Sequence, residues 1–111
     1  MNNLLIKDLI DEKYILHTKS DLNIEVSGMY SGDLLSNAIS KAVSGGVFIT
    51  VISNTNTVAV AVMVDIPLII LCEGLTPTDE MIKRAEDEDI TILSTTMKSY
   101  ECVIDLYNKG L

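Results

Sequence analysis

From residue 47 onward, short apolar runs alternate with segments that carry helix signals. The runs Val47–Ile52, Leu68–Cys72 and Ile90–Leu93 have the length and the branched side chains of buried strands. The segments between and after them begin with capping residues or show helical spacing. Strands that alternate with helices form parallel sheets, so the pattern predicts an α/β fold with a mainly parallel sheet and flanking helices.

The segment Val58–Val64 is apolar throughout, so its periodicity alone fits a buried strand or a buried helix. Its valines favour a strand, because β-branched side chains lose rotamer freedom in a helix. The residues 53–57 before it are all N-cap candidates, and a right-handed crossover needs an element between the two flanking strands. We therefore predict a helix here.

Two more helices are predicted in the second half of the chain. Thr76 is the expected cap of the first, with Pro77 at its first helical position. The second follows residues 94–96, and its apolar positions recur at helical spacing, which predicts one buried face. That face consists of Tyr100, Val103, Ile104 and Tyr107.

The first 46 residues give shorter elements. An amphipathic helix is expected over Leu4–Asp11, a brief strand at residues 14–17, and a strand over Ile24–Tyr30 in which Gly28 marks a bulge or a close approach. A helix over residues 34–42 follows, with Ser31 or Asp33 as its cap.

Length and charge limit the classes of function. A chain of 111 residues fits one domain, over residues 1–111, and its net charge of −8 repels phosphate backbones and anionic membrane surfaces. The longest apolar runs, Val58–Val64 and Ile66–Cys72, have seven residues each, whereas a membrane span needs about 20. We expect a cytoplasmic protein that binds neither nucleic acid nor membrane, with Cys72 and Cys102 as reduced core thiols.

No self-contained catalytic motif is present. His17 is the only histidine, and no Asp, Glu or Cys stands at a metal-ligand spacing from it. The chain has no phosphate-binding glycine loop and no nucleophile elbow. The acidic clusters Asp11-Glu12 and Glu86–Asp89 are expected to be solvated. The sequence therefore predicts no catalytic residue, no metal and no cofactor.

The turns that follow three of the strands are small and polar. In parallel sheets, ligands collect at the carboxyl ends of the strands, where helix N-termini offer free N–H groups. These turns could hold a nucleotide, or their residues could serve only as helix caps. The candidate ligand-binding residues are Ser53, Asn54, Asn56, Gly74, Thr76, Ser94 and Thr95.

Four segments, in this order, resemble the DRTGG domain family over nearly the whole chain. Residues 26–36, with Ser27, Gly28 and Asp33 as motif residues, resemble the family's turn and helix start. Residues 48–61 look like its next strand and helix, and Gly74 with residues 77–80 and residues 92–95 look like its next two turns. The namesake Asp-Arg pair is absent, and Leu75 stands where an Arg is common.

This resemblance implies a fold similar to the amino-terminal domain of HPr kinase/phosphorylase. It also implies a regulatory or interaction module without catalysis of its own, which self-associates as a homodimer or binds another protein encoded nearby. The alternative is a sensor that binds an adenine nucleotide at the strand-to-helix turns.

Overall fold

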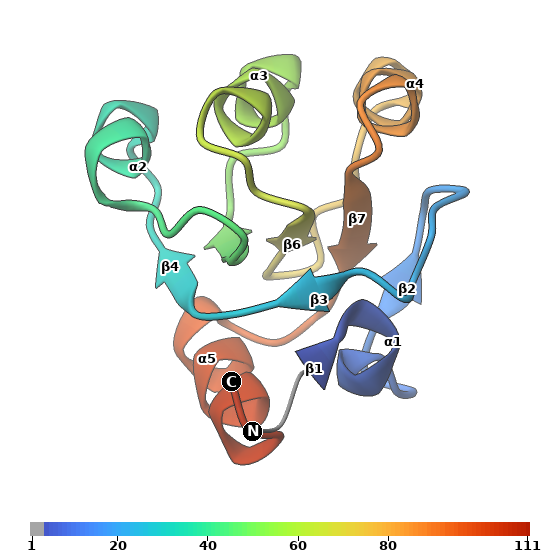
Figure 1. Cartoon of the computed structure of the whole chain (residues 1–111), viewed down its shortest axis with the longest axis vertical. Coiled ribbons are helices and arrows are strands. Elements are labelled where there is room, and N and C mark those ends of the chain that lie inside the picture. The colour runs from blue at the N-terminus through green and yellow to red at the C-terminus, as the bar shows by residue number, and fades with distance from the viewer. Residues whose placement is uncertain (1–3) are drawn as a thin grey trace.

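A five-stranded sheet forms the centre of the molecule (Figure 1). The computed structural model describes residues 4–111. The strand order is β2-β7-β6-β5-β4, with β2 antiparallel to β7 and all other neighbours parallel. The mainly parallel α/β fold is therefore confirmed. The strands are β2 (Ile15–Leu16), β4 (Met29–Ser31), β5 (Val47–Thr50), β6 (Leu68–Leu71) and β7 (Thr91–Ser94).

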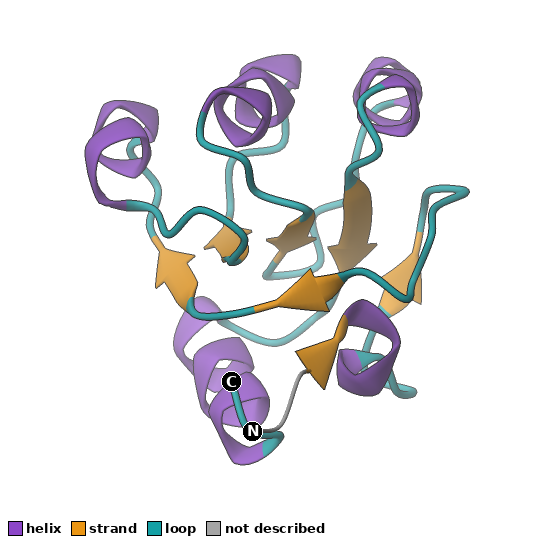
Figure 2. Cartoon of the chain, viewed as in Figure 1, coloured by secondary structure: helices purple, strands orange, loops and turns teal. Residues whose placement is uncertain are grey.

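Helices cover both faces of this sheet, as Figure 2 shows. On one face lie α2 (Leu35–Lys41), α3 (Thr55–Met63) and α4 (Asp79–Asp87). The opposite face is covered by α1 (Ile6–Leu9), α5 (Ser99–Asn108) and a small antiparallel pair of β1 (Leu4–Leu5) with β3 (Glu25–Val26). The chain is thus built in three layers.

The central strands explain the two helical layers. Every residue of β5, β6 and β7 is buried, as in parallel sheets that are covered on both faces. Successive side chains point to opposite faces. Phe48, Ile69 and Ile92 stand in register and pack under α2, α3 and α4, whereas the following residue of each strand packs toward α1 and α5.

The ambiguous apolar segment is a helix, as predicted. The Asn54 side chain caps α3 by accepting a hydrogen bond from the Asn56 backbone N–H at 2.8 Å. Thr57 Oγ1 donates to the Ile52 carbonyl at 2.7 Å and ties the first turn of the helix to the preceding strand end.

The cap of α4 differs from the prediction. Thr78, and not Thr76, caps this helix, because its Oγ1 accepts from the Met81 N–H at 3.1 Å. The Thr76 carbonyl instead accepts a 2.6 Å hydrogen bond from Ser53 Oγ. Pro77 therefore precedes the cap and is not the first residue of the helix.

The first half of the chain forms shorter elements than predicted. The single strand predicted over Ile24–Tyr30 is two strands in different sheets, β3 and β4. The chain turns at Gly28, whose φ is +78°, a conformation that glycine adopts without strain. The predicted opening helix keeps only four residues, because Leu4 and Leu5 pair with β3. Neither Ser31 nor Asp33 caps α2, which begins after Leu34.

The last helix turns a different face to the sheet than predicted. Cys102 and Leu106 are its buried residues. Of the predicted face, Val103 is half-buried, whereas Tyr100, Ile104 and Tyr107 are exposed. The helix therefore carries two apolar stripes, and the sheet covers one of them.

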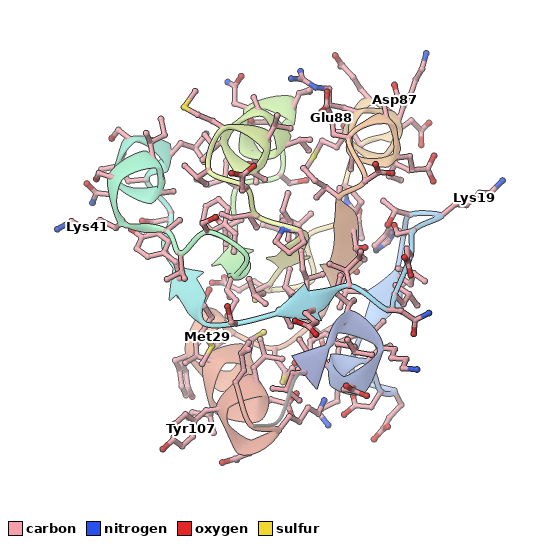
Figure 3. All side chains as sticks on the ribbon, viewed as in Figure 1. Lys19, Met29, Lys41, Asp87, Glu88 and Tyr107 are labelled. Carbon is pink, nitrogen blue, oxygen red and sulfur yellow. The ribbon has the colours of Figure 1, made fainter. Side chains whose placement is uncertain are left out.

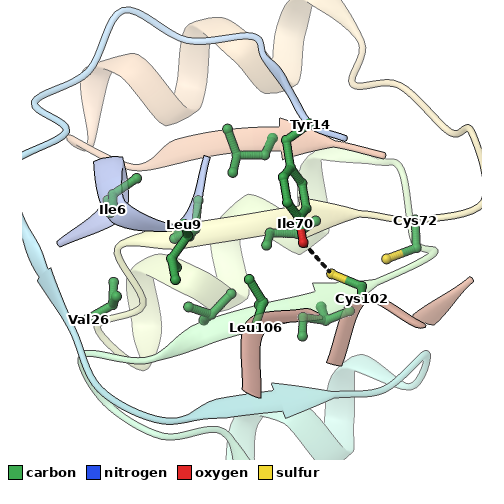
Figure 4. Close-up of a cluster of buried hydrophobic side chains, with 12 residues drawn as sticks. Ile6, Leu9, Tyr14, Val26, Ile70, Cys72, Cys102 and Leu106 are labelled. Atoms are coloured by element: carbon green, nitrogen blue, oxygen red, sulfur yellow. Dashed lines mark hydrogen bonds between the residues drawn. The ribbon is translucent and has the colours of Figure 1, made fainter. Parts of the chain in front are cut away.

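Both thiols lie in the core beneath the sheet, as predicted (Figure 4). Cys72 follows β6, and Cys102 lies on α5 and contacts the Tyr14 hydroxyl at 3.8 Å. The neighbouring Cys72 thiol and the burial of Cys102 raise the pKa of Cys102. Burial also raises the pKa of Tyr14.

A polar cluster joins the start of the chain to its last helix. Lys109 Nζ lies 2.6 Å from Asp11 and 3.0 Å from Asp105, and it donates to the Leu9 carbonyl at 2.8 Å. The hydrogen bonds from Lys109 and Lys13 lower the pKa of Asp11. Burial acts to raise the pKa of Asp105, but hydrogen bonds from the Tyr14 hydroxyl and Lys109 outweigh it and lower that pKa.

We expect Lys109→Met to lower the free energy of unfolding by about 1–2 kcal/mol at pH 7, since it removes charge-assisted hydrogen bonds in a half-exposed cluster. Both carboxyl groups have a folded-state pKa below the ordinary 3.8. Their stabilising contribution is complete above that value and is lost as the pH falls below it. The difference in unfolding free energy between wild type and Lys109→Met should therefore become smaller below about pH 4.

Urea denaturation at pH 7 and pH 3 measures this effect. Lys83→Met, which changes an exposed lysine of α4, is the control for the loss of one positive charge. An equal difference in unfolding free energy at both pH values would contradict the stabilising role of the Asp11 and Asp105 carboxylates.

Candidate functional site

The strand-to-helix turns meet at the carboxyl edge of the parallel strands. Backbone hydrogen bonds hold the turn after β6 against the turn after β7: Glu73 N–H donates to the Met97 carbonyl at 2.8 Å and Gly74 N–H to the Thr95 carbonyl at 3.0 Å. Ser53 links the turn after β5 to Thr76. Three loops that are distant in sequence thus form one connected rim.

A hollow of about 380 Å³ opens at this rim, beside β7 and β2. Four of the seven predicted ligand-binding residues line it: Gly74, Thr76, Ser94 and Thr95. Ile15 from the edge strand β2, Glu12 and Lys13 from the turn before it, and Thr96 and Met97 complete the wall. We call this the β7 hollow. Its size falls within the range of small-molecule sites.

The wall of the β7 hollow is rich in hydroxyl groups and carries two charged side chains, Glu12 and Lys13. Thr76, Thr95 and Thr96 supply side chains that donate and accept hydrogen bonds. Lys13, its only lysine, pairs with Asp11 at 2.8 Å and with Asp105 at 3.4 Å. The exposed Ile15 and the half-buried Met97 add apolar surface. This wall suits an uncharged polar group, such as a base or a sugar, better than a phosphate.

His17 forms a contact that sequence spacing did not reveal. Its Nε2 lies 2.7 Å from Ser94 Oγ, although the two residues are 77 positions apart. Ser94 is buried and lies on the wall of the β7 hollow. Burial lowers the pKa of His17 and favours the neutral ring. A histidine hydrogen-bonded to a serine could act as a base, but the Ser94 hydroxyl is almost fully enclosed.

The other predicted ligand-binding residues lie outside this hollow. Asn54 is used as the cap of α3, and the Asn56 backbone donates to it. Ser53 Oγ donates to Thr76 and also approaches Met81 Sδ at 3.8 Å. The turns after β6 and β7 thus line the β7 hollow together. The turn after β5 contacts them through Ser53 but does not line the hollow.

A second hollow, of about 220 Å³, lies between the turns after β4, β5 and β6. Asp33, one of the three family-motif residues, lines it together with Ser31, Glu73 and Ser99. The other two motif residues support the backbone: Ser27 N–H donates to the Gly45 carbonyl, and the Gly28 carbonyl accepts from the Val47 N–H, each at 3.0 Å. Ser27 and Gly28 therefore hold the chain just before β4 against the start of β5.

Residues 4–111 contain no group of three or more His, Cys, Asp or Glu side chains placed to hold a metal ion. No helix in the same range is long and apolar enough to cross a membrane.

The family model described as the HPr serine kinase N terminus matches residues 47–108, which is more than half of the chain. The chain belongs to this family. The match runs from β5 to the end of α5 and includes the turns of the β7 hollow. The resemblance seen in the sequence is thereby confirmed, and the matched residues include the parallel strands β5, β6 and β7.

The fold also matches solved structures. One is the crystal structure of the CBS and DRTGG domains of the regulatory region of Clostridium perfringens pyrophosphatase, complexed with the activator diadenosine tetraphosphate. The TM-score is 0.77 at 16% sequence identity, over 96% of this chain and 50% of that one. This chain thus spans half the length of that structure, and the likeness establishes the fold. A search of curated proteins finds no match.

The placement of Asn54 yields a direct test. We expect Asn54→Ala to cost about 1 kcal/mol of unfolding free energy, because the first turn of α3 loses its cap. We expect Asn54→Asp to retain most of the stability, since Asp is also a good cap. Urea denaturation monitored by circular dichroism measures both variants. Equal stability of Asn54→Ala and wild type would contradict the capping role.

Proposed function

We propose that the chain is a non-catalytic regulatory module that acts in the cytoplasm as a homodimer, folded as one domain over residues 1–111. Its membership of the HPr serine kinase N-terminal family carries this proposal. The likeness of its fold to part of a pyrophosphatase regulatory region supports it. Another protein encoded nearby is the partner on which the module would act.

The chemistry of the rim also supports a role without catalysis. The Ser94 hydroxyl is held by His17 at 2.7 Å and is only 2% exposed at the residue level. A nucleophile has to reach its substrate, and this hydroxyl is positioned to support the turn after β7. The hydrogen bond anchors the edge strand β2 to β7, next to their antiparallel pairing.

The β7 hollow favours a second candidate function, the sensing of a small ligand. Its hydroxyl-rich wall and its apolar side chains suit the adenine ring and the ribose of a nucleotide. Most of its residues come from the two rim turns that hold each other by backbone hydrogen bonds. Because Lys13 is already paired with carboxylates, the phosphates would extend into solvent. A nucleoside or a monophosphate would then bind as well as a triphosphate.

The oligomeric state tests the leading proposal. We expect size-exclusion chromatography with light scattering to give a mass that approaches twice the chain mass of 12.1 kDa as the concentration rises through the micromolar range. A constant mass of one chain over that range would overturn self-association.

Thermal unfolding with adenosine, AMP and ATP tests the ligand proposal. A ligand at 100 times its Kd should stabilise the fold by about 2.7 kcal/mol and raise the Tm. Thr96→Trp places a large side chain on the wall of the β7 hollow and should abolish the rise. Asn56→Trp, the same change outside the hollow, should leave it intact. The absence of any rise in wild type, or an equal loss in both variants, would count against this site.

A further inference from the structure

Helix α5 exposes an apolar stripe that nothing in residues 4–111 covers. Tyr100, Ile104 and Tyr107 are 62%, 54% and 70% exposed. They are spaced four and three residues apart, so they lie on one face of the helix. Figure 3 shows Tyr107 pointing away from the sheet. Cys102 and Leu106, on the face turned toward the sheet, are completely buried.

The surroundings of the stripe differ from the rest of the surface. The chain carries a net charge of −8, yet no charged residue interrupts the row from Tyr100 to Tyr107. The carboxylates of α5 lie on its flank, where Glu101 accepts from the Lys98 N–H and Asp105 pairs with Lys109. Exposed tyrosines in an apolar stripe are typical of protein interfaces.

The spacing of the stripe is close to symmetric about Ile104. If two copies of α5 pack antiparallel, Ile104 of one copy meets Ile104 of the other at the two-fold axis. Tyr100 of each copy then lies opposite Tyr107 of the other. A two-fold interface requires this self-complementarity, in which the same patch serves both subunits.

Net charge bears on which face two copies would share. Two chains of −8 repel each other, so they associate most readily where the contact surface carries no charge. The exposed Met63 lacks this setting. It is 65% exposed but lies at the end of α3, two residues before the exposed Asp65.

We infer that the stripe of Tyr100, Ile104 and Tyr107 is the surface through which two copies of this chain associate, with α5 packed antiparallel against α5. This inference rests on the self-association proposed above and names its surface. Three side chains per copy make a small interface, so we expect a weak, reversible dimer with a Kd on the order of 10 μM. Added salt should tighten it, because salt screens the repulsion between two acidic chains.

The experiment compares sedimentation equilibrium of wild type, Ile104→Glu and Ile104→Lys across the micromolar range. Either variant alone places two like charges at the two-fold axis and should weaken the dimer at least about 100-fold. An equimolar mixture of the two places opposite charges there and should restore association. Met63→Glu is the matched control, since it introduces the same charge at an equally exposed helical position.

The outcomes separate the two proposals. A monomeric wild type overturns both self-association and this surface. A dimer that persists in Ile104→Glu as in wild type leaves the proposed function standing and overturns the α5 surface. If the mixture stays monomeric, Ile104 does not meet its own counterpart, and the antiparallel arrangement is wrong. Circular dichroism spectra and melting curves that match wild type show that the variants are folded.

Discussion

The whole architecture depends on the burial of three short parallel strands on both faces. Strands β5, β6 and β7 have four residues each, all of them buried. Such strands need an apolar layer above and below, and a chain of 111 residues has few helices with which to provide both. The three crossover helices, α2, α3 and α4, form the layer above the sheet in Figure 1. The layer below it, here called the lower layer, is formed by α5 and by the irregular opening segment with α1, β1 and β3.

The same constraint places the polar rim. With parallel strands, the turns after β5, β6 and β7 all come to one edge, and their backbone groups must find partners away from the sheet. They find them in each other: the turn after β6 bonds to the turn after β7, and Ser53 reaches Thr76. The β7 hollow lies where these loops meet the antiparallel edge strand β2, which contributes Ile15 to its wall.

Much of this could be predicted from local chemistry, and the rest could not. The alternating strands and helices after residue 46 follow from apolar runs and caps, and Asn54 is a cap in the structure as well. The predicted cap at Thr76 is wrong because a tertiary hydrogen bond from Ser53 engages its carbonyl. The pairing of His17 with Ser94 joins positions 77 residues apart, and no spacing rule finds it. The apolar periodicity of α5 is real, but periodicity identifies an apolar face and not the surface that covers it.

The lower layer also brings the two ends of the described chain into contact. Gly110 lies close to the Leu4 side chain, and Lys109 bonds to the Leu9 carbonyl. A domain whose ends meet can be inserted into a loop of a host protein without separating the two points of insertion. A fold of this kind is therefore suited to insertion at a single point of another chain.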